Sequence, residues 1–271
     1  MRKIFSVLLA GAFFAASFGV SAEAHEFWVN AEYKDGLLKA DLGYGHEYPD
    51  PEPIAADRTH LFEPLKLITA EGAKEMAQTG ADNFHYEAAA DLKKGDYLVI
   101  GNYKPTFWAK GAEGWKQADK AKYKELTKAD ATYAEEAAMY AKLVLNLDGA
   151  EGMDVITKPV GQRLEMVPQV NPATVKPGQR FPVLILVDGK PAKTAEVKAV
   201  YAGFAGDTKD GDPANEYKAF YGRTDLKGII NIIPSKAGYW NASVEVKVPY
   251  ADKTVADESV LVSRLTFMIA E

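Results

Sequence analysis

The chain has 271 residues, a net charge of −6 at pH 7 and no cysteine. Its length allows two domains of ordinary size. Without cysteine there can be no disulfide, no thiolate nucleophile and no thiolate metal site, so a metal ion must be held by imidazole, carboxylate, thioether or backbone groups. The acidic balance, without any basic run, predicts no nucleic-acid partner.

Residues 1–24 have the three parts of a secretory signal peptide. A short cationic start is followed by the mostly apolar residues 4–20, and Ala22 and Ala24 fit the small-residue rule for cleavage. We therefore predict a periplasmic protein that begins at His25 after cleavage and has no stable membrane insertion. Cleavage after Ala22 and an uncleaved anchor are the alternatives, although the apolar stretch is short for a span of about 20 residues.

Short alternating segments bounded by turns predict a β-rich domain over residues 25–114. A Lys-Asp-Gly turn at residues 34–36 separates its first two strands, and three prolines make residues 45–53 a loop. Strands are expected at residues 25–33, 37–44, 65–70, 73–78, 84–89 and 97–103.

The composition changes over residues 115–147, where Ala, Lys and Glu dominate. Tyr133, Ala137, Tyr140 and Val144 recur at helical spacing. This pattern predicts one or two helices that cover the β domain or bridge to the next one.

Glycine and proline cluster at residues 148–161, which predicts a domain boundary there. Short strands with turns about every ten residues then favour an immunoglobulin-like β-sandwich over residues 162–271. The strands are expected at residues 164–168, 181–187, 197–203, 229–233, 242–248 and 261–269. The predicted fold is therefore mainly β, with two β-sandwich-like domains, the C-terminal one immunoglobulin-like, and a helical segment between them.

All four histidines lie in the first predicted domain: His25, His46, His60 and His85. Histidine is the ligand that a cysteine-free transition-metal site needs, so this clustering indicates a metal site. Glu47 could bind the ion directly or orient an imidazole through its second nitrogen. The alternative for each residue is an ordinary surface or partly buried side chain.

His25 carries the most specific signal, because cleavage after Ala24 would give it a free amine. The amine and Nδ1 of one residue can chelate a metal ion, and both lose their protons at modest cost near neutral pH. One further imidazole gives three nitrogen donors, which suit Cu(II) or Ni(II). The β-favouring residues 27–29 would anchor this terminus, whereas the alternative is a frayed end.

Four blocks of sequence carry a family resemblance. They are His-Glu-Phe-Trp at residues 25–28, Leu-Glu-Met-Val-Pro-Gln-Val-Asn-Pro at 164–172, Val-Asp-Gly-Lys-Pro at 187–191 and Ala-Gly-Tyr-Trp at 237–240. They resemble the NikM-like nickel-uptake family of exported bacterial proteins, largely a family of unknown function. The resemblance implies a β-rich exported protein associated with nickel or cobalt uptake, a membrane permease as partner, and a metal-binding role for His25.

The leading hypothesis is thus a periplasmic transition-metal-binding protein, not an enzyme, that serves as an accessory in nickel or cobalt uptake. It would bind a divalent ion through the amine and imidazole of His25, with His46 and either His60 or His85 completing the site. Nickel follows from the resemblance, while copper or cobalt fits the same ligands. The alternatives are a copper-dependent oxidoreductase with a terminal-histidine site and a metal-free adhesion or carbohydrate-binding protein.

Overall fold

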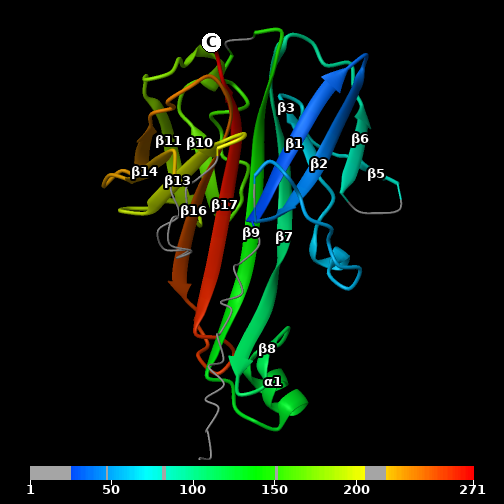
Figure 1. The fold of residues 1–271 in the computed structure, drawn as a ribbon, viewed down its shortest axis with the longest axis vertical. Helices are drawn as coiled ribbons and strands as arrows, with labels where there is room; N and C mark the ends of the chain where they lie inside the picture. The colour runs from blue at the N-terminus through cyan, green and yellow to red at the C-terminus, as the bar shows by residue number, and fades with distance from the viewer. Residues whose placement is uncertain (1–25, 47, 81–83, 150–151, 205–217) are drawn as a thin grey trace, which may run out of the picture.

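The structure is a computed structural model that describes residues 26–46, 48–80, 84–149, 152–204 and 218–271. It is mainly β, which confirms the predicted fold class (Figure 1). The strands are β1 (Glu26–Lys34), β2 (Leu37–Gly45), β3 (Lys66–Thr69), β4 (Gly72–Glu75), β5 (Ala77–Thr79), β6 (His85–Ala89), β7 (Gly95–Gly111), β8 (Gly114–Lys116), β9 (Tyr133–Leu147), β10 (Leu164–Pro168), β11 (Phe181–Val187), β12 (Lys190–Pro191), β13 (Glu196–Tyr201), β14 (Phe220–Arg223), β15 (Ile229–Ile232), β16 (Gly238–Pro249) and β17 (Glu258–Ile269). The helices are η1 (Thr59–Leu61), α1 (Lys120–Thr127) and η2 (Pro172–Thr174).

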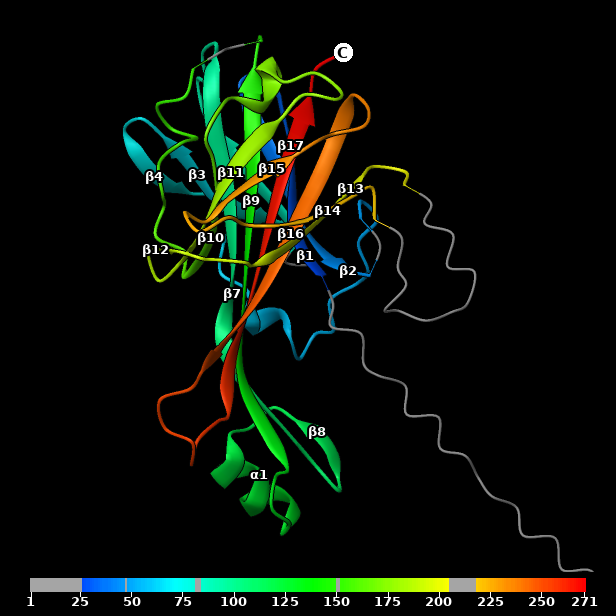
Figure 2. The same cartoon turned by 90° about the vertical axis from the view of Figure 1, so that its left-hand side faces the viewer.

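The strands form three layers with a nine-stranded sheet in the middle. Its order is β14-β13-β16-β17-β9-β7-β3-β4, with β8 beside β7. One small sheet, β1-β2-β6-β5, packs on one face, and the other, β10-β11-β12 with β15, packs on the opposite face (Figure 2). Alternate residues of β9 accordingly belong to two different cores: Leu143 and Leu145 face β1 and β2, whereas Tyr140 and Val144 face β10 and β11.

The prediction of helices over residues 115–147 is wrong for most of that segment. Only residues 120–127 are helical, and Asp119 caps this helix by accepting a hydrogen bond from the Lys122 amide at 2.7 Å. Residues 133–147 form β9, which pairs antiparallel with β7 and parallel with β17. Both faces of β9 are buried over residues 140–145, so its sequence there is apolar apart from Lys142 and lacks the alternation of a half-exposed strand.

The C-terminal half has the strand pairing of an immunoglobulin-like sandwich. Its first, second and sixth strands, β10, β11 and β15, share one sheet, while β13, β16 and β17 share the other. Phe181 and Phe267 meet between the two sheets with ring centroids 4.6 Å apart. The predicted boundary at residues 148–161 lies between β9 and β10, but the nine-stranded sheet continues across it through the β9–β17 pair. The segments on either side of residues 148–161 therefore both contribute strands to the nine-stranded sheet.

The long strands β7, β9, β16 and β17 project beyond the two small sheets, and α1 and β8 lie at the end of this projection (Figure 2). A third small core, which includes Ala109, Tyr123, Ala134 and Ala256, fills it. Its stability therefore depends on contacts within the projection itself.

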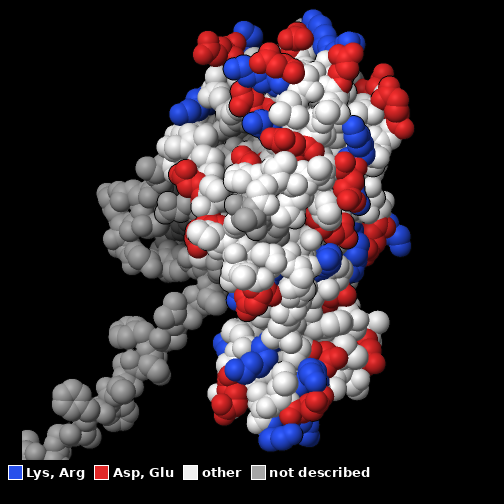
Figure 3. Space-filling view, turned by 90° about the vertical axis from the view of Figure 1, so that its right-hand side faces the viewer, with Lys and Arg blue, Asp and Glu red and all other residues white. Residues whose placement is uncertain are grey.

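Lys and Arg are interspersed with Asp and Glu on the face drawn in Figure 3, so no stripe of one sign crosses it. In the part of the chain that the structure describes, no helix has the length and apolar character that crossing a membrane requires.

Candidate metal site at the start of the first strand

The β1–β2 hairpin positions the site. Its turn is made by Asp35 and Gly36, which both have positive φ (51° and 80°), as a tight hairpin turn requires. The resulting register places Glu26 opposite Gly45. His46 therefore follows β2 at the point where β1 starts. His25, which is bonded to Glu26, and Glu47 lie outside the described residues.

His46 is held by a carboxylate. Its Nδ1 lies 2.5 Å from Oε1 of Glu52, and its backbone amide donates to the same oxygen at 3.2 Å. The Glu52 amide in turn donates to the carbonyl of Tyr44 at 2.7 Å and closes the loop. A carboxylate on one ring nitrogen is the usual partner of a metal-binding histidine, because it fixes the ring and directs the second nitrogen toward the ion.

Aromatic packing holds the start of β1 in place. Trp28 is fully buried, and its indole lies so close over Gly43 that a Cβ there would be 2.1 Å from Nε1. The ring of Tyr48 meets this indole edge-on at 5.8 Å, and burial raises the pKa of Tyr48. On the other face, Phe27 belongs to the core between β1 and the nine-stranded sheet. Residues 27–29 are thus all buried, while His25, which they are predicted to anchor, lies outside the described residues.

His85 belongs to a different place on the same sheet. It pairs with Asp41 in the β2–β6 register, and its Nδ1 lies 2.6 Å from Oδ1 of that residue. Asp41 precedes His46 by five residues, which is about 16 Å along an extended strand. His85 and His46 are thus not brought together.

His60 lies in η1, where its carbonyl accepts a hydrogen bond from Nζ of Lys104 at 2.7 Å. Over the described residues there is no group of three His, Asp or Glu side chains that could hold a metal ion. A complete site of three such side chains would therefore need at least one residue outside them, such as His25 or Glu47.

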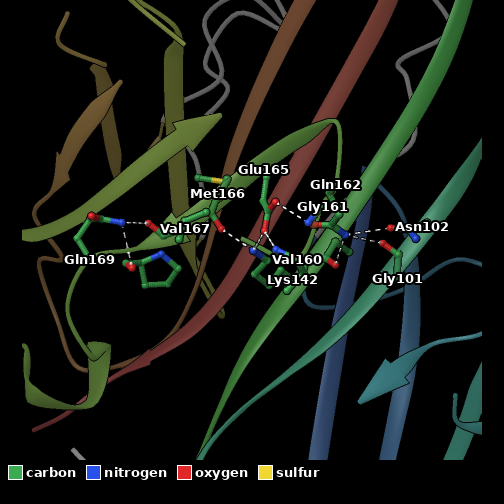
Figure 4. Close-up of polar contacts among 12 residues, drawn as sticks. Gly101, Asn102, Lys142, Val160, Gly161, Gln162, Glu165, Met166, Val167 and Gln169 are labelled. Atoms are coloured by element: carbon green, nitrogen blue, oxygen red, sulfur yellow. Dashed lines mark hydrogen bonds and ion pairs between the residues drawn. The ribbon is translucent and has the colours of Figure 1, made fainter. Parts of the chain in front are cut away.

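The most deeply buried charges lie elsewhere, between β9 and β10. The side chains of Lys142 and Glu165 are 1% and 2% exposed, and Nζ lies 2.6 Å from Oε1 (Figure 4). Glu165 also accepts hydrogen bonds from the amides of Val160 and Gly161, and Lys142 donates to the carbonyl of Met166 at 3.0 Å. Burial lowers the pKa of Lys142.

Gln162 extends this polar cluster toward β7. Its amide nitrogen lies 3.0 Å from Oδ1 of Asn102 and 3.3 Å from the carbonyls of Gly101 and Ala141 (Figure 4). The cluster joins the connection after β9 to two central strands, which is a structural role. Sequence reasoning missed it, although Lys142 is the only charged residue in the apolar run 137–147.

Two comparisons with known proteins give no functional guide. No curated protein matches the chain. A solved structure described as native alpha-2-macroglobulin from Escherichia coli, spanning domains MG0-NIE-MG1, is 10% identical with a TM-score of 0.21, covering 92% of this chain and 72% of that one. Similarity at this level carries no argument about function.

The third comparison gives a family. The family described as "Domain of unknown function (DUF4198)" matches residues 22–248, which is most of the sequence. The chain therefore belongs to the DUF4198 family.

Proposed function

We propose that the exported protein binds a divalent transition-metal ion through the amine and imidazole of His25 and the imidazole of His46. The observation that carries this proposal is the pairing of Glu26 with Gly45, because the residue before Glu26 and the residue after Gly45 are both histidines. Two histidines thus flank, in sequence, the first residue pair of the hairpin.

The environment of His46 fits such a site. Glu52 holds Nδ1, so the other ring nitrogen is the donor that we assign to the metal ion. An amine and two imidazoles are nitrogen donors of the kind that Ni(II) and Cu(II) prefer. The β2–β6 register separates His85 from His46, so we leave it out of this set. We leave His60 out as well, and Glu47 stays a predicted additional ligand.

The biological role that we propose is an accessory in nickel or cobalt uptake that delivers the ion, as cargo, to a membrane permease. Support for nickel comes from the resemblance of residues 25–28 to the start of NikM-like proteins. We propose periplasmic export and cleavage after Ala24 as well, since the His25 amine does not exist before cleavage.

The test is a competition titration of the exported protein with Ni(II) and Cu(II), after its mass has been measured. We expect a terminus at His25, and a loss of affinity of about tenfold or more in His25→Ala and in His46→Ala. His85→Ala is the matched control, because it removes a carboxylate-paired imidazole from the same sheet.

Unchanged affinity in His25→Ala, or a mature terminus at Glu23, would exclude the proposed site. Oxidation of a reductant by the copper-loaded protein and oxygen would instead favour the copper-dependent oxidoreductase.

A further inference from the structure

Two glutamates meet one tyrosine where β9 and β17 begin, beside the projection that carries α1 (Figure 1). Glu135 and Glu258 are the first residue pair of the parallel β9–β17 pairing. The hydroxyl of Tyr133 lies 2.7 Å from Oε2 of Glu135 and 2.6 Å from Oε1 of Glu258. All three residues are partly buried. Two carboxyl groups from adjacent strands thus share one phenol.

The number of hydrogens available to these contacts limits how they can form. A tyrosine hydroxyl has one hydrogen to donate, whereas an ionised carboxylate can only accept. Both distances are those of good O–H···O hydrogen bonds, and one hydrogen cannot lie on the line to two oxygens. One of the two contacts must therefore receive its hydrogen from the carboxyl side, which requires that one glutamate is protonated.

The surroundings indicate which glutamate holds this proton. Nζ of Lys247, on β16, lies 3.4 Å from Oε1 of Glu258 and favours the ionised form of that carboxyl group. Burial is the main cause that raises the pKa of Glu135, and the negative charges of Glu258 and Glu245 raise it further. Lys247 and a hydrogen bond from Tyr133 lower the same pKa, but burial is the larger effect.

The strand on the other side of β9 brings a positive charge. β7 places Lys110 opposite Tyr133 in the β7–β9 register. Nζ of Lys110 lies 5.8 Å from the ring centroid of Trp115, and that ring meets the Tyr133 ring edge-on at 5.8 Å. The charged side chains around the two glutamates therefore come from β7 (Lys110) and from β16 (Glu245 and Lys247).

We propose that Glu135, Tyr133 and Glu258 form a pH-sensitive latch between β9 and β17, in which Glu135 stays protonated in a pH range where an exposed glutamate is ionised. Glu135 donates to the hydroxyl of Tyr133, and Tyr133 donates to Glu258. While Glu135 holds its proton, the three side chains join the two strands. Once the proton leaves, two negative charges face one phenol from adjacent strands, and their repulsion opens this end of the strand pair.

The latch controls how firmly the projection is attached. Asp257, next to Glu258, accepts hydrogen bonds from the amide of Ala134 at 2.9 Å and from Nζ of Lys120, the first residue of α1, at 2.6 Å. An opening at Glu258 therefore loosens the contact between α1 and the long strands. The centre of the nine-stranded sheet does not depend on these contacts.

The direction of the pH effect follows from the raised pKa of Glu135. The unfolded chain releases this proton near the usual glutamate value of 4.5, whereas the folded protein keeps it to higher pH. The stabilisation by the latch is therefore complete below about pH 4.5 and is lost as the pH rises through the raised pKa.

The protonation of Glu135 can be measured by NMR titration of the side-chain carboxyl carbons in isotope-labelled wild-type protein. We expect Glu135 to titrate at a higher pH than Glu113, an exposed glutamate between β7 and β8. Glu258→Gln should lower the pH at which Glu135 titrates, because it removes the neighbouring negative charge. Titration of Glu135 together with Glu113, or a delayed titration at Glu258 in place of Glu135, would overturn the proposal.

Amide hydrogen exchange measures the latch itself. From about pH 5 to about pH 8, protection of residues 133–136 and 258–260, corrected for the intrinsic rate at each pH, should fall in the wild type. The fall should reach up to about tenfold for each pH unit by which the pKa of Glu135 exceeds its unfolded value.

Glu135→Gln is the informative variant for exchange, because its neutral side chain can donate to Tyr133 at any pH. Its protection should stay constant over the same range. Glu113→Gln is the matched control, since it removes one carboxylate from an exposed position in the projection and should behave as the wild type does. A folded Glu135→Gln variant whose protection falls with pH as in the wild type would contradict the latch.

Discussion

At the scale of single residues, the pair Lys142–Glu165 is the contact with the largest expected effect. Lys142→Met would leave Glu165 as a buried carboxylate with only two backbone donors. Removing one partner of a buried ion pair costs about 3–5 kcal/mol. We therefore expect urea unfolding of this variant to show a loss of that size, and a smaller loss when Glu165→Gln is added. A loss below about 1 kcal/mol would contradict the buried pair.

Gly43 is a second residue at which the structure makes a sharp prediction. Any Cβ at this position would collide with the indole of Trp28, which is fully buried and cannot retreat into solvent. Gly43→Ala should lower the free energy of unfolding by about 1–3 kcal/mol, the usual cost of overpacking. Lys39→Ala on the same strand removes an exposed side chain and is the control. Equal melting temperatures for the two variants would show that the close contact is absent.

The candidate site was predictable from residue type only in part. His46 and His85 stand out as rare imidazoles, but their partners Glu52 and Asp41 depend on a closed loop and on the β2–β6 register. Neither follows from local sequence. The same holds for Tyr133, whose contact with Glu258 requires the parallel β9–β17 pair.

At the scale of elements, β9 shows why sequence periodicity failed. Tyr133 and Ala137 lie on one face of the strand, whereas Tyr140 and Val144 lie on the other, so their helical spacing was coincidental. In a short apolar run that is buried on both sides, the spacing of the apolar residues does not distinguish a strand from a helix. The contacts with β7 and β17 override the helix preference of Ala, Lys and Glu.

Amide hydrogen exchange tests the place of β9. Its amides are paired on both sides at the centre of the nine-stranded sheet, whereas β4 and β14 are edge strands. We expect residues 133–147 to exchange among the slowest in the protein and residues 72–75 and 220–223 among the fastest. Fast exchange throughout residues 133–147 would contradict the central position.

At the scale of the whole molecule, buried tyrosines make stability depend on alkaline pH. Burial is the first cause that raises the pKa above the usual value of 10.0 for the buried or half-buried Tyr44, Tyr48, Tyr86, Tyr103, Tyr133 and Tyr140. The unfolded chain therefore releases these protons first as the pH rises. Since the folded state then binds more protons than the unfolded state, stability must fall with pH in that range.

We expect these tyrosines to contribute a constant amount to the free energy of unfolding below about pH 10 and progressively less above it. Urea unfolding from pH 8 to pH 12 measures this, with tyrosinate absorbance as a second signal. Absorbance that rises before unfolding would show that these hydroxyls are not protected by the fold.

The mainly β class and most strand positions followed from alternation and turn residues, as for residues 164–168 and 181–187. The three-layer arrangement did not. It depends on the parallel pairing of β9 with β17, which joins two halves that glycine and proline appeared to separate. Local sequence contains no information about such a long-range pair.

The central claim is that His25 and His46 bind one metal ion, and a crystal structure of the exported protein with bound Ni(II) or Cu(II) tests it most directly. The account predicts anomalous density at the start of β1, with the His25 amine, the His25 imidazole and the His46 imidazole each about 2.0–2.1 Å from the ion, as nitrogen ligands of such ions commonly are. Density at His85 and Asp41 alone, or a His25 amine with no metal beside it, would contradict it.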